Sequence, residues 1–368
     1  MSNPESLPFP ASIDEYQAQA EELFKNVESQ DKAAEWRFKW MHPRFRGKAV
    51  ADVRATDLVL SDAQTVVAHE YSFENWADLV AFTKAVRQDL SVMQFEAAVE
   101  AVISGDAAAL GEMLRDHPEL VRARSTRRHH ATLLHYVAAN GVEAGRQKTP
   151  ANALEVAKIL LDVGAEVDAL ADMYDQQCTT MSMLVSSCHP AKAGLQAALA
   201  ELLLDHGAAL EGPGSKWQSA LMTALAFGYL GTAKTLAIRG APLNSIAAVA
   251  GLGRVDDTAR LLPAANALDR QVALALAAQH GQAEVIRLLL DAGEDPNRYN
   301  PDGFHSHSTP LHQAVCAGHA EAVKLLVQRG ARLDIRDTIH QSTPLGWAIY
   351  CAKPKIEEYL RAQGAPPS

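Results

Sequence analysis

The stretch that decides the fold is Thr309-Pro-Leu-His-Gln-Ala-Val-Cys-Ala-Gly318-His319, which continues into Ala322-Val-Lys-Leu-Leu-Val-Gln-Arg-Gly330-Ala331. The Thr-Pro pair is typical of a helix start, because the hydroxyl can cap free N–H groups and proline has no N–H to leave unpaired. Apolar residues follow at helical spacing, and Gly318 permits a tight turn into a second helix. The second helix carries its own apolar stripe and ends at Gly330-Ala331. The stretch therefore predicts two short helices joined by a tight turn.

The pattern recurs at Thr343-Pro-Leu-Gly-Trp-Ala-Ile-Tyr-Cys-Ala352, followed by Ile356-Glu-Glu-Tyr-Leu-Arg-Ala-Gln-Gly364-Ala365. Other predicted helix starts lie upstream, near Thr132, Thr180, Ser219, Asn244 and Val272. These units resemble the ankyrin repeat, with Thr-Pro-Leu-His as the specific motif. The resemblance implies an all-α fold, a solenoid of helix–turn–helix repeats with β-turn fingers. About eight repeats would fill residues 91–368.

The predicted array is uneven. The intervals between Ser219, Asn244 and Val272 are too short for full fingers, whereas Val142–Pro150 and Pro190–Leu195 insert extra residues between two helices. The finger before Thr309 is also lengthened. Long fingers beside a trimmed centre predict a groove that is more enclosed than in a regular array.

Residues 1–90 lack the repeat and predict a separate small helical domain. Ser12-Ile-Asp-Glu15 is a capping box ahead of a helix. Further helices are expected at Lys32–Trp40 and up to Val86, with a basic, aromatic loop at His42–Gly47. The segment is similar to helices that precede the repeats in many bacterial ankyrin proteins of unassigned role. Its aromatic residues are expected to pack against the first repeat: Trp36, Trp40, Tyr71, Phe73 and Trp76.

The composition argues against several classes of partner. The formal net charge of −10 over 368 residues disfavours non-specific binding to nucleic acid or to anionic membranes. No signal peptide is recognisable at the start, and no apolar stretch approaches the roughly 18 residues of a membrane span. The four cysteines are far apart and form no C-x-x-C pair. We therefore expect a cytoplasmic protein with no cofactor and no nucleic-acid or membrane partner.

Histidines near the last full finger form the first candidate site. His305 and His307 alternate in an extended segment and so share a face, and with His312 they make three imidazoles, a set that can bind zinc. The alternative is that His312 is the ordinary histidine of the Thr-Pro-Leu-His motif and that the other two are polar finger residues. We expect no bound metal, because no carboxylate or second spaced pair accompanies them.

A cluster of cations just before Thr132 forms the second candidate site. It comprises Arg122, Arg124, Arg127, Arg128, His129 and His130. Fingers project near helix N-termini, where free N–H groups favour anions, so a carboxylate or phosphate ligand could bind there. The alternative is a solvated finger that promotes solubility.

Residues that line the inner face of the array form the third candidate site. Counting from each helix start, the ligand-facing positions are Tyr136, Asn140, Ser187, Phe227, Trp347 and Tyr350. Aromatic side chains in a concave surface are typical anchors of binding sites. Several of them could equally fill space between fingers.

Two functions follow from these residues. The first is a non-catalytic module that recognises a protein partner, or a small anionic ligand, in a concave groove. The second is an enzyme or small-molecule binder whose acid–base groups would be His305, His307, Asp175 and Tyr174, acting on a small anionic substrate. No complete catalytic signature is present, so enzymatic activity stays open.

Overall fold

The computed structural model describes residues 6–212 and 219–366. Contacts divide the chain into two compact units, residues 1–218 and 219–368. This division falls inside the repeat array. Within the first unit, buried residues between positions 11 and 92 form a hydrophobic cluster of their own. The predicted domain boundary at residue 90 lies close to the end of this cluster, and it stays a prediction.

The N-terminal helices surround an apolar core. Their bounds are α1 (Ile13–Glu28), α2 (Lys32–Met41), η1 (Pro43–Phe45), α3 (Val50–Arg54), α4 (Leu60–Glu70) and α5 (Trp76–Gln88). The capping box predicted at Ser12 starts α1, with Ser12 N donating to Glu15 Oε2 at 2.7 Å. Tyr71 and Phe73 are buried as predicted, but Trp40 is exposed and only stacks on the half-buried Trp36. The interpretation of Trp40 as a core residue was therefore wrong.

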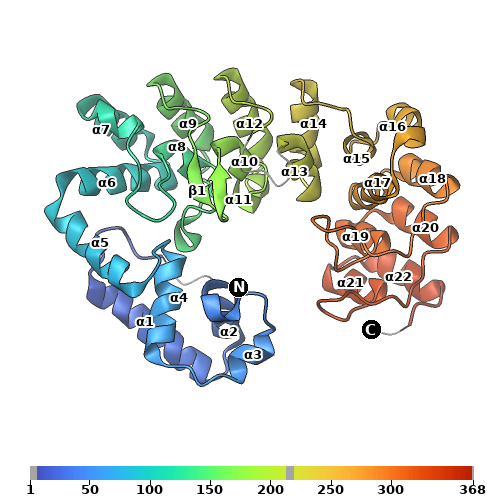
Figure 1. The fold of residues 1–368 in the computed structure, drawn as a ribbon, viewed down its shortest axis with the longest axis horizontal. Coiled ribbons are helices and arrows are strands. Elements are labelled where there is room, and N and C mark those ends of the chain that lie inside the picture. Colours follow the sequence, from blue (N-terminus) through green and yellow to red (C-terminus); the bar gives the residue numbers. More distant parts are fainter. Residues whose placement is uncertain (1–5, 213–218, 367–368) are drawn as a thin grey trace. The chain divides into compact units, whose positions relative to one another are not determined.

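Helix pairs continue the first unit. Their bounds are α6 (Leu90–Ser104), α7 (Ala107–Asp116), η2 (Pro118–Val121), α8 (Leu133–Val137), η3 (Ala144–Arg146), α9 (Ala153–Asp162), α10 (Thr180–Leu184), α11 (Cys188–Lys192) and α12 (Gln196–Asp205). The two predicted insertions fold as η3 and α11, each between the two helices of a repeat. Helices α9 and α12 pack side by side, with α8 and α10 forming the second layer (Figure 1).

One finger is a β-hairpin. Strands β1 (Ala171–Met173) and β2 (Gln176–Cys178) pair antiparallel, with Ala171 opposite Cys178. The fold is therefore a mostly helical ankyrin solenoid, as predicted, with a short two-stranded sheet in one finger.

The second unit is also built from helix pairs. Their bounds are α13 (Ala220–Ala226), α14 (Leu230–Ile238), α15 (Ile246–Gly251), α16 (Val255–Leu261), η4 (Leu262–Ala264), α17 (Ala267–Gln279), α18 (Ala283–Asp291), α19 (Pro310–Ala317), α20 (Ala320–Gln328), α21 (Pro344–Tyr350) and α22 (Pro354–Ala362). Helices α15, α17, α19 and α21 pack in succession, and α16, α18, α20 and α22 form a second layer (Figure 1). Leu274, Ile286, Val315 and Leu326 are among the residues of its continuous core.

The helix starts confirm the capping argument in part. Thr309 and Thr343 are N-cap residues, and Gly318 ends α19 in the left-handed region with φ of 87°. The start predicted at Val272 was wrong, because α17 begins five residues earlier, where Asn266 accepts a hydrogen bond from Asp269 N at 2.9 Å. Asn266 is the N-cap of α17, the position that Thr309 and Thr343 occupy in the Thr-Pro repeats.

Candidate functional site

A cavity of the first unit lies beside the β1–β2 hairpin. We call this cavity of about 680 Å³ the hairpin pocket. Its lining comes from the η1 loop, the turn after α4, the finger at 125–131 and the hairpin. The lining residues are Arg46, Ser72, Arg128, His129, Gly141, Asp172, Met173, Tyr174, Asp175, Gln176 and Gln177.

The turn of the hairpin is strained. Tyr174 and Asp175 are its two central residues, and both have a left-handed backbone, with φ of 53° and 60°. Two-residue hairpin turns of this type strongly favour Asn-Gly, because each non-glycine residue there costs about 1–2 kcal/mol. The Tyr174 residue is nevertheless 63% exposed, and its hydroxyl donates a hydrogen bond to the Asn140 side chain. The turn thus holds an aromatic ring at the edge of the pocket.

Gly141 allows the tyrosine ring to approach the chain closely. Its φ is 74°, and an added Cβ would lie 2.9 Å from Met173 Sδ and 3.2 Å from the Tyr174 ring. No real Cβ tolerates the first of these distances. A side chain at position 141 would therefore displace the Met173 thioether and press on the Tyr174 ring.

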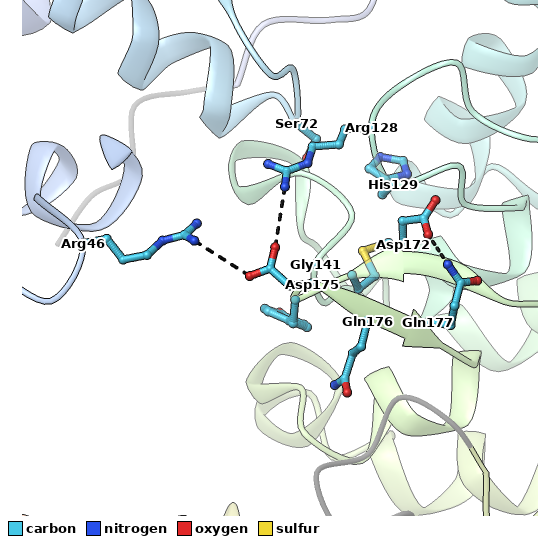
Figure 2. A pocket seen from close by; sticks show the side chains of 11 residues that line it. Arg46, Ser72, Arg128, His129, Gly141, Asp172, Asp175, Gln176 and Gln177 are labelled. Atoms are coloured by element: carbon cyan, nitrogen blue, oxygen red, sulfur yellow. Dashed lines mark hydrogen bonds and ion pairs between the residues drawn. The ribbon is translucent and has the colours of Figure 1, made fainter. Parts of the chain in front are cut away.

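Loose ion pairs join the two sides of the pocket. The Asp175 carboxylate lies 3.8 Å from an Arg46 nitrogen and 3.6 Å from an Arg128 nitrogen, and both arginines point toward it in Figure 2. All three side chains are more than half exposed. Exposed pairs of this length contribute little to stability, so either arginine can exchange Asp175 for another anion.

Arg128 also borders a second cavity. This cavity of about 470 Å³ is lined by α5 residues, including Asp78 and Phe82, and by Thr126 and His130 of the same finger. Because Arg128 lines both cavities, an extended ligand that crosses from one to the other would pass over its guanidinium group.

The neighbouring Arg127 has the opposite environment. Its guanidinium is buried, forms ion pairs with Glu96 (2.9 Å) and Glu143, and lies over the Phe82 ring at 4.5 Å. Arg146 adds a second cation, 3.2 Å from Glu96 and 3.3 Å from Glu143. Two buried arginines thus balance two buried glutamates, and this pairing offsets part of the free-energy cost of burying their charges.

The electrostatics of this buried cluster are set by competing effects. Burial alone raises the pKa of Glu143, but the charges of Arg127 and Arg146 outweigh it and hold that pKa at about 2. The Tyr136 hydroxyl donates to Glu143 at 2.9 Å, and burial raises the pKa of Tyr136 well above its usual value. Glu143 therefore stays ionised in the interior of the first unit at neutral pH.

Several residues predicted to bind a ligand are buried and make contacts within the fold. Arg127 and Tyr136 belong to the buried cluster, and the solvated-finger alternative is equally wrong for Arg127. His129 is buried, and its Nδ1 accepts from Ala131 N at 3.1 Å. Ser187 is buried and donates to Ala139 O at 3.1 Å. These side chains serve the fold because the chain turns their polar atoms inward.

Other predicted residues keep accessible polar groups. Arg128 lines both cavities. Arg124 donates to His130 O at 2.9 Å and to Leu170 O at 2.5 Å, so it ties the finger to the hairpin. Asn140 donates to Met183 O at 3.0 Å and accepts the Tyr174 hydroxyl, which makes it a support for the turn.

In the second unit, the rings of His305 and His307 contact each other at 6.0 Å between centroids, and His307 and His312 both pack on Trp347. Nε2 of His305 lies 3.2 Å from Ala226 O, and the His307 ring packs on Trp347 at 5.8 Å. His312 Nδ1 accepts from Thr309 N at 3.3 Å, and its Nε2 lies 3.3 Å from Ser342 O. Across residues 6–212 and 219–366, no group of three or more His, Cys, Asp or Glu is arranged to hold a metal ion. The proposed imidazole triad is thus not assembled, and His312 has its ordinary repeat role.

The aromatic residues proposed for the inner face of the second unit differ from one another. Trp347 is half-buried, and its Nε1 donates to Asp337 Oδ2 at 3.0 Å, so it stabilises a finger. Phe227 and Tyr350 are exposed and remain available to a partner. Of the proposed acid–base residues, Tyr174 and Asp175 belong to the first unit and His305 and His307 to the second. Their joint role stays a prediction.

The sequence reasoning missed Glu96, Glu143, Arg146 and Arg46. Glu96 has a sequence signal, since it interrupts the apolar run Phe95-Glu-Ala-Ala-Val99, which lies in α6. A charged residue on an otherwise apolar face needs a buried partner, and Arg127 is that partner. Arg46 was noticed only as part of a basic loop.

These helix pairs, fingers and caps define a class, the ankyrin-repeat solenoids. Residues 274–368 match the family model described as ankyrin repeats in three copies. Residues 274–368 therefore contain ankyrin repeats. Among the described residues, none of the helices is both long and apolar enough to cross a membrane.

Similar proteins share the repeats over limited stretches. An ankyrin repeat-containing protein of Schizosaccharomyces pombe is 40% identical over 85 residues, 23% of this chain and 37% of that protein. Mouse ankyrin repeat and SAM domain-containing protein 6 is 32% identical over 114 residues, 30% of this chain and 12% of that protein. The chain thus spans little more than a third of the length of the first relative and much less of the second. The ankyrin repeat domain of human ASB11 aligns with 74% of this chain and 99% of its own, at 19% identity and a TM-score of 0.38.

Proposed function

We propose that this protein binds a segment of another protein and that the hairpin pocket is its main contact. Ankyrin repeats generally serve protein–protein interaction. Fingers and inner helices are the surfaces that such arrays offer to partners, and the hairpin pocket is built from two fingers and the η1 loop. The concave groove predicted from the sequence would continue this contact along the inner helices.

The observation that carries the proposal is the strained Tyr174–Asp175 turn. A folded chain that needed only a tight turn would favour Asn-Gly at these two positions. Backbone strain is retained where the surrounding structure uses it, and here it presents a tyrosine to solvent. Tyrosine is a frequent anchor in binding interfaces, because it offers a large rigid surface and one polar group.

The charges of the rim indicate the chemistry of the segment. Arg46 and Arg128 are both exposed and only loosely paired with Asp175. A partner carboxylate could replace Asp175 between them, while an apolar side chain covers the Tyr174 ring. We therefore propose an extended segment with an acidic residue next to an apolar one.

A second candidate is a small anionic ligand or substrate in the same pocket. Its support is the cavity volume of about 680 Å³, which lies within the range of small-molecule sites. Such a ligand would bind the same arginines without needing the exposed tyrosine ring. The cytoplasmic location and bacterial origin predicted from the sequence fit either candidate and remain proposals.

The test combines identification of the partner with measured affinities. A photoreactive phenylalanine analogue at position 174 would cross-link the partner in cells, and mass spectrometry would identify the captured segment. A synthetic peptide of that segment is then titrated against the full chain and two variants. Tyr174→Ala is expected to weaken binding at least tenfold, or about 1.4 kcal/mol. Arg128→Gln is expected to weaken it less and to reduce its dependence on salt.

Tyr350→Ala is the matched control, because it removes an exposed tyrosine from the second unit. The proposal expects unchanged affinity. Loss of affinity in Tyr350→Ala but not in Tyr174→Ala would contradict the hairpin pocket and move the contact to the second unit. Peptide binding that a small dicarboxylate abolishes, with Tyr174→Ala unaffected, would favour the second candidate.

A further inference from the structure

An exposed pair of tryptophans lies on the outward side of α2. The rings of Trp36 and Trp40, about one helical turn apart, stack with their centroids 6.1 Å apart and their planes inclined by 17°. Trp40 is 70% exposed, and neither ring is part of the apolar core to which α2 contributes Phe38. Single exposed apolar side chains are ordinary, but two large rings side by side are typical of a surface that binds something. The core therefore gives no reason for this pair.

The same side of α2 carries cations. Lys32 precedes Trp36 by one turn, and Lys39 Nζ lies 5.0 Å from the centre of the Trp40 ring. Positions 32, 36, 39 and 40 have the i, i+4, i+7, i+8 spacing of a single helix face. Lys39 Nζ also donates to Lys48 O, which brings the loop after η1 next to the end of α2. Two tryptophans and two lysines thus share one face, with a third lysine beside it.

The segment that contains this face is basic, although the whole chain is acidic. Residues 32–48 contain six Lys or Arg and one acidic residue, a formal charge of +5 in a chain of −10. The single acid, Glu35, is buried and pairs with Arg54 at 2.5 Å. Two of the cations face carboxylates of other segments. Within residues 6–212 and 219–366, no carboxylate forms an ion pair with the other four, which are Lys32, Lys39, Arg44 and Lys48.

We propose that these side chains form a peripheral binding site for an anionic lipid surface. We call them the tryptophan face, which comprises Lys32, Trp36, Lys39, Trp40, Arg44 and Lys48. Tryptophan favours the headgroup level of a bilayer, because its ring is apolar and its N–H can meet water. Lysine and arginine beside such rings attract anionic headgroups. A bilayer surface also needs no groove in the protein, so a protruding ring suits it.

The face is already formed in the free chain. Phe38, on the opposite side of α2, is fully buried, and α2 packs on α1, α3 and α4. The tryptophan face is therefore held outward by the bundle, and binding requires no ordering of a loose segment. The site does not depend on the function proposed above.

The negative charge of the whole chain opposes this contact only weakly. Charges act through water over roughly 8 Å at physiological salt, so the cations nearest to the lipid determine the attraction. The sequence argument against membranes used the net charge alone and did not consider this local excess. Since neither one inserted ring nor a few cations anchor a protein firmly, we expect reversible binding that needs both.

The test measures partition of the full chain onto large unilamellar vesicles by co-sedimentation. One set of vesicles contains phosphatidylcholine alone, and the other contains equal amounts of phosphatidylcholine and phosphatidylserine. We expect binding to the second set and little to the first, with a partition coefficient that falls as salt rises. Brominated acyl chains should quench tryptophan fluorescence of the bound chain, and Trp40→Phe should reduce that quenching.

Two variants separate the contribution of the ring from that of the charges. Trp40→Ala should lower the partition coefficient about tenfold, because the more exposed ring is lost. Lys39→Gln combined with Lys48→Gln should lower it about fivefold per lysine and should weaken its dependence on salt. None of these side chains is buried, so the melting temperature should change little.

The matched controls carry the same kinds of change at exposed positions of the second unit. Tyr350→Ala removes an exposed ring, and Lys234→Gln combined with Lys355→Gln removes two charges. Both should bind the anionic vesicles as the unaltered chain does. Equal losses in the two double-lysine variants would overturn the proposal, because the net charge would then set the binding.

Two further outcomes would overturn the proposal. The first is equal partition onto both sets of vesicles, or no partition onto either. The second is binding of single-stranded RNA without partition onto the anionic vesicles, which would indicate that bases stack on the two rings instead.

Discussion

Arg127 and Arg128 are adjacent in the sequence, and yet they have opposite environments. The side chain of Arg127 is 1% exposed, and that of Arg128 is 57% exposed. The finger turns between them, with Arg128 N donating to Ser72 O at 3.3 Å. One arginine therefore belongs to the buried cluster, and the other is available at the surface.

This contrast gives a prediction for stability. Arg127→Gln leaves Glu96 and Glu143 with a single buried cation, so the free energy of unfolding of the first unit should fall by roughly 3–5 kcal/mol. Arg128→Gln is its matched control and should change that free energy by less than about 0.5 kcal/mol. Urea unfolding followed by circular dichroism measures both. An equal loss of unfolding free energy in the two variants would contradict the prediction that burial of the guanidinium determines the loss.

The sequence could not separate these two arginines. Both lie in a polar finger with no periodicity, so nothing local tells which side chain turns inward. The distinction depends on Glu96 of α6 and on Glu143 from the segment before η3, both of which contact the finger only after the repeats stack. Arg128 and Asp175 were each predicted as site residues. The contact between them could not be predicted, because the two residues lie in segments that are far apart in the sequence.

At the scale of elements, the predictable parts are those with local chemistry. The caps at Thr309 and Thr343 and the capping box at Ser12 are read directly from adjacent residues, and the structure confirms them. The β1–β2 hairpin was not predicted, because its strands have three residues each and its turn lacks the Asn-Gly signal. Tertiary packing against the finger at 125–131 selects it instead, with Asp172 N donating to His129 O at 2.8 Å.

The strained turn predicts a gain in stability at the expense of binding. Tyr174→Asn combined with Asp175→Gly supplies the residues that this turn favours, so the free energy of unfolding should rise by about 1 kcal/mol. Part of the gain is offset because the hydrogen bond from Tyr174 to Asn140 is lost. Tyr174→Phe, which removes only that hydrogen bond, is the control and should be slightly less stable than the unaltered chain. A double variant that is less stable than Tyr174→Phe would contradict strain in the turn.

At the scale of the whole chain, buried neutral histidines occur in both units. His135, His280 and His312 each have a pKa lowered from 6.5 to about 4, in each case chiefly by burial. His135 Nδ1 accepts from Thr132 N at 3.1 Å, as His312 Nδ1 accepts from Thr309 N. A proton on that nitrogen would remove the acceptor, so these hydrogen bonds also favour the neutral ring.

The sign of the pH dependence follows from these values. The unfolded chain binds protons at these histidines near pH 6.5 and the folded chain only near pH 4, so their contribution is complete above pH 6.5 and is lost as pH falls toward 4. At pH 5.5 each histidine should lower the free energy of unfolding by about 1.4 kcal/mol relative to pH 7.5. Urea unfolding at the two pH values measures this change. A His312→Gln variant should lose part of the dependence of the unfolding free energy on pH. His340→Gln, at an exposed position, is the control and should keep it. An equal dependence on pH in both variants would contradict the role given to His312.

The buried cluster also bears on how such a chain can change over evolution or in the laboratory. Ankyrin arrays are often regarded as modular, with repeats that can replace one another. The last repeats of this chain carry the family motif and fit that view. Around α6 and α8 it fails, because Glu96, Arg127, Glu143 and Arg146 come from three successive segments, namely α6, the finger at 125–131 and the η3 segment, and neutralise one another. A graft that replaces one of these segments with a consensus repeat would strand an unpaired charge in the interior. This part of the chain must therefore be inherited or transplanted as a block, and tolerated recombination points should lie in the second unit.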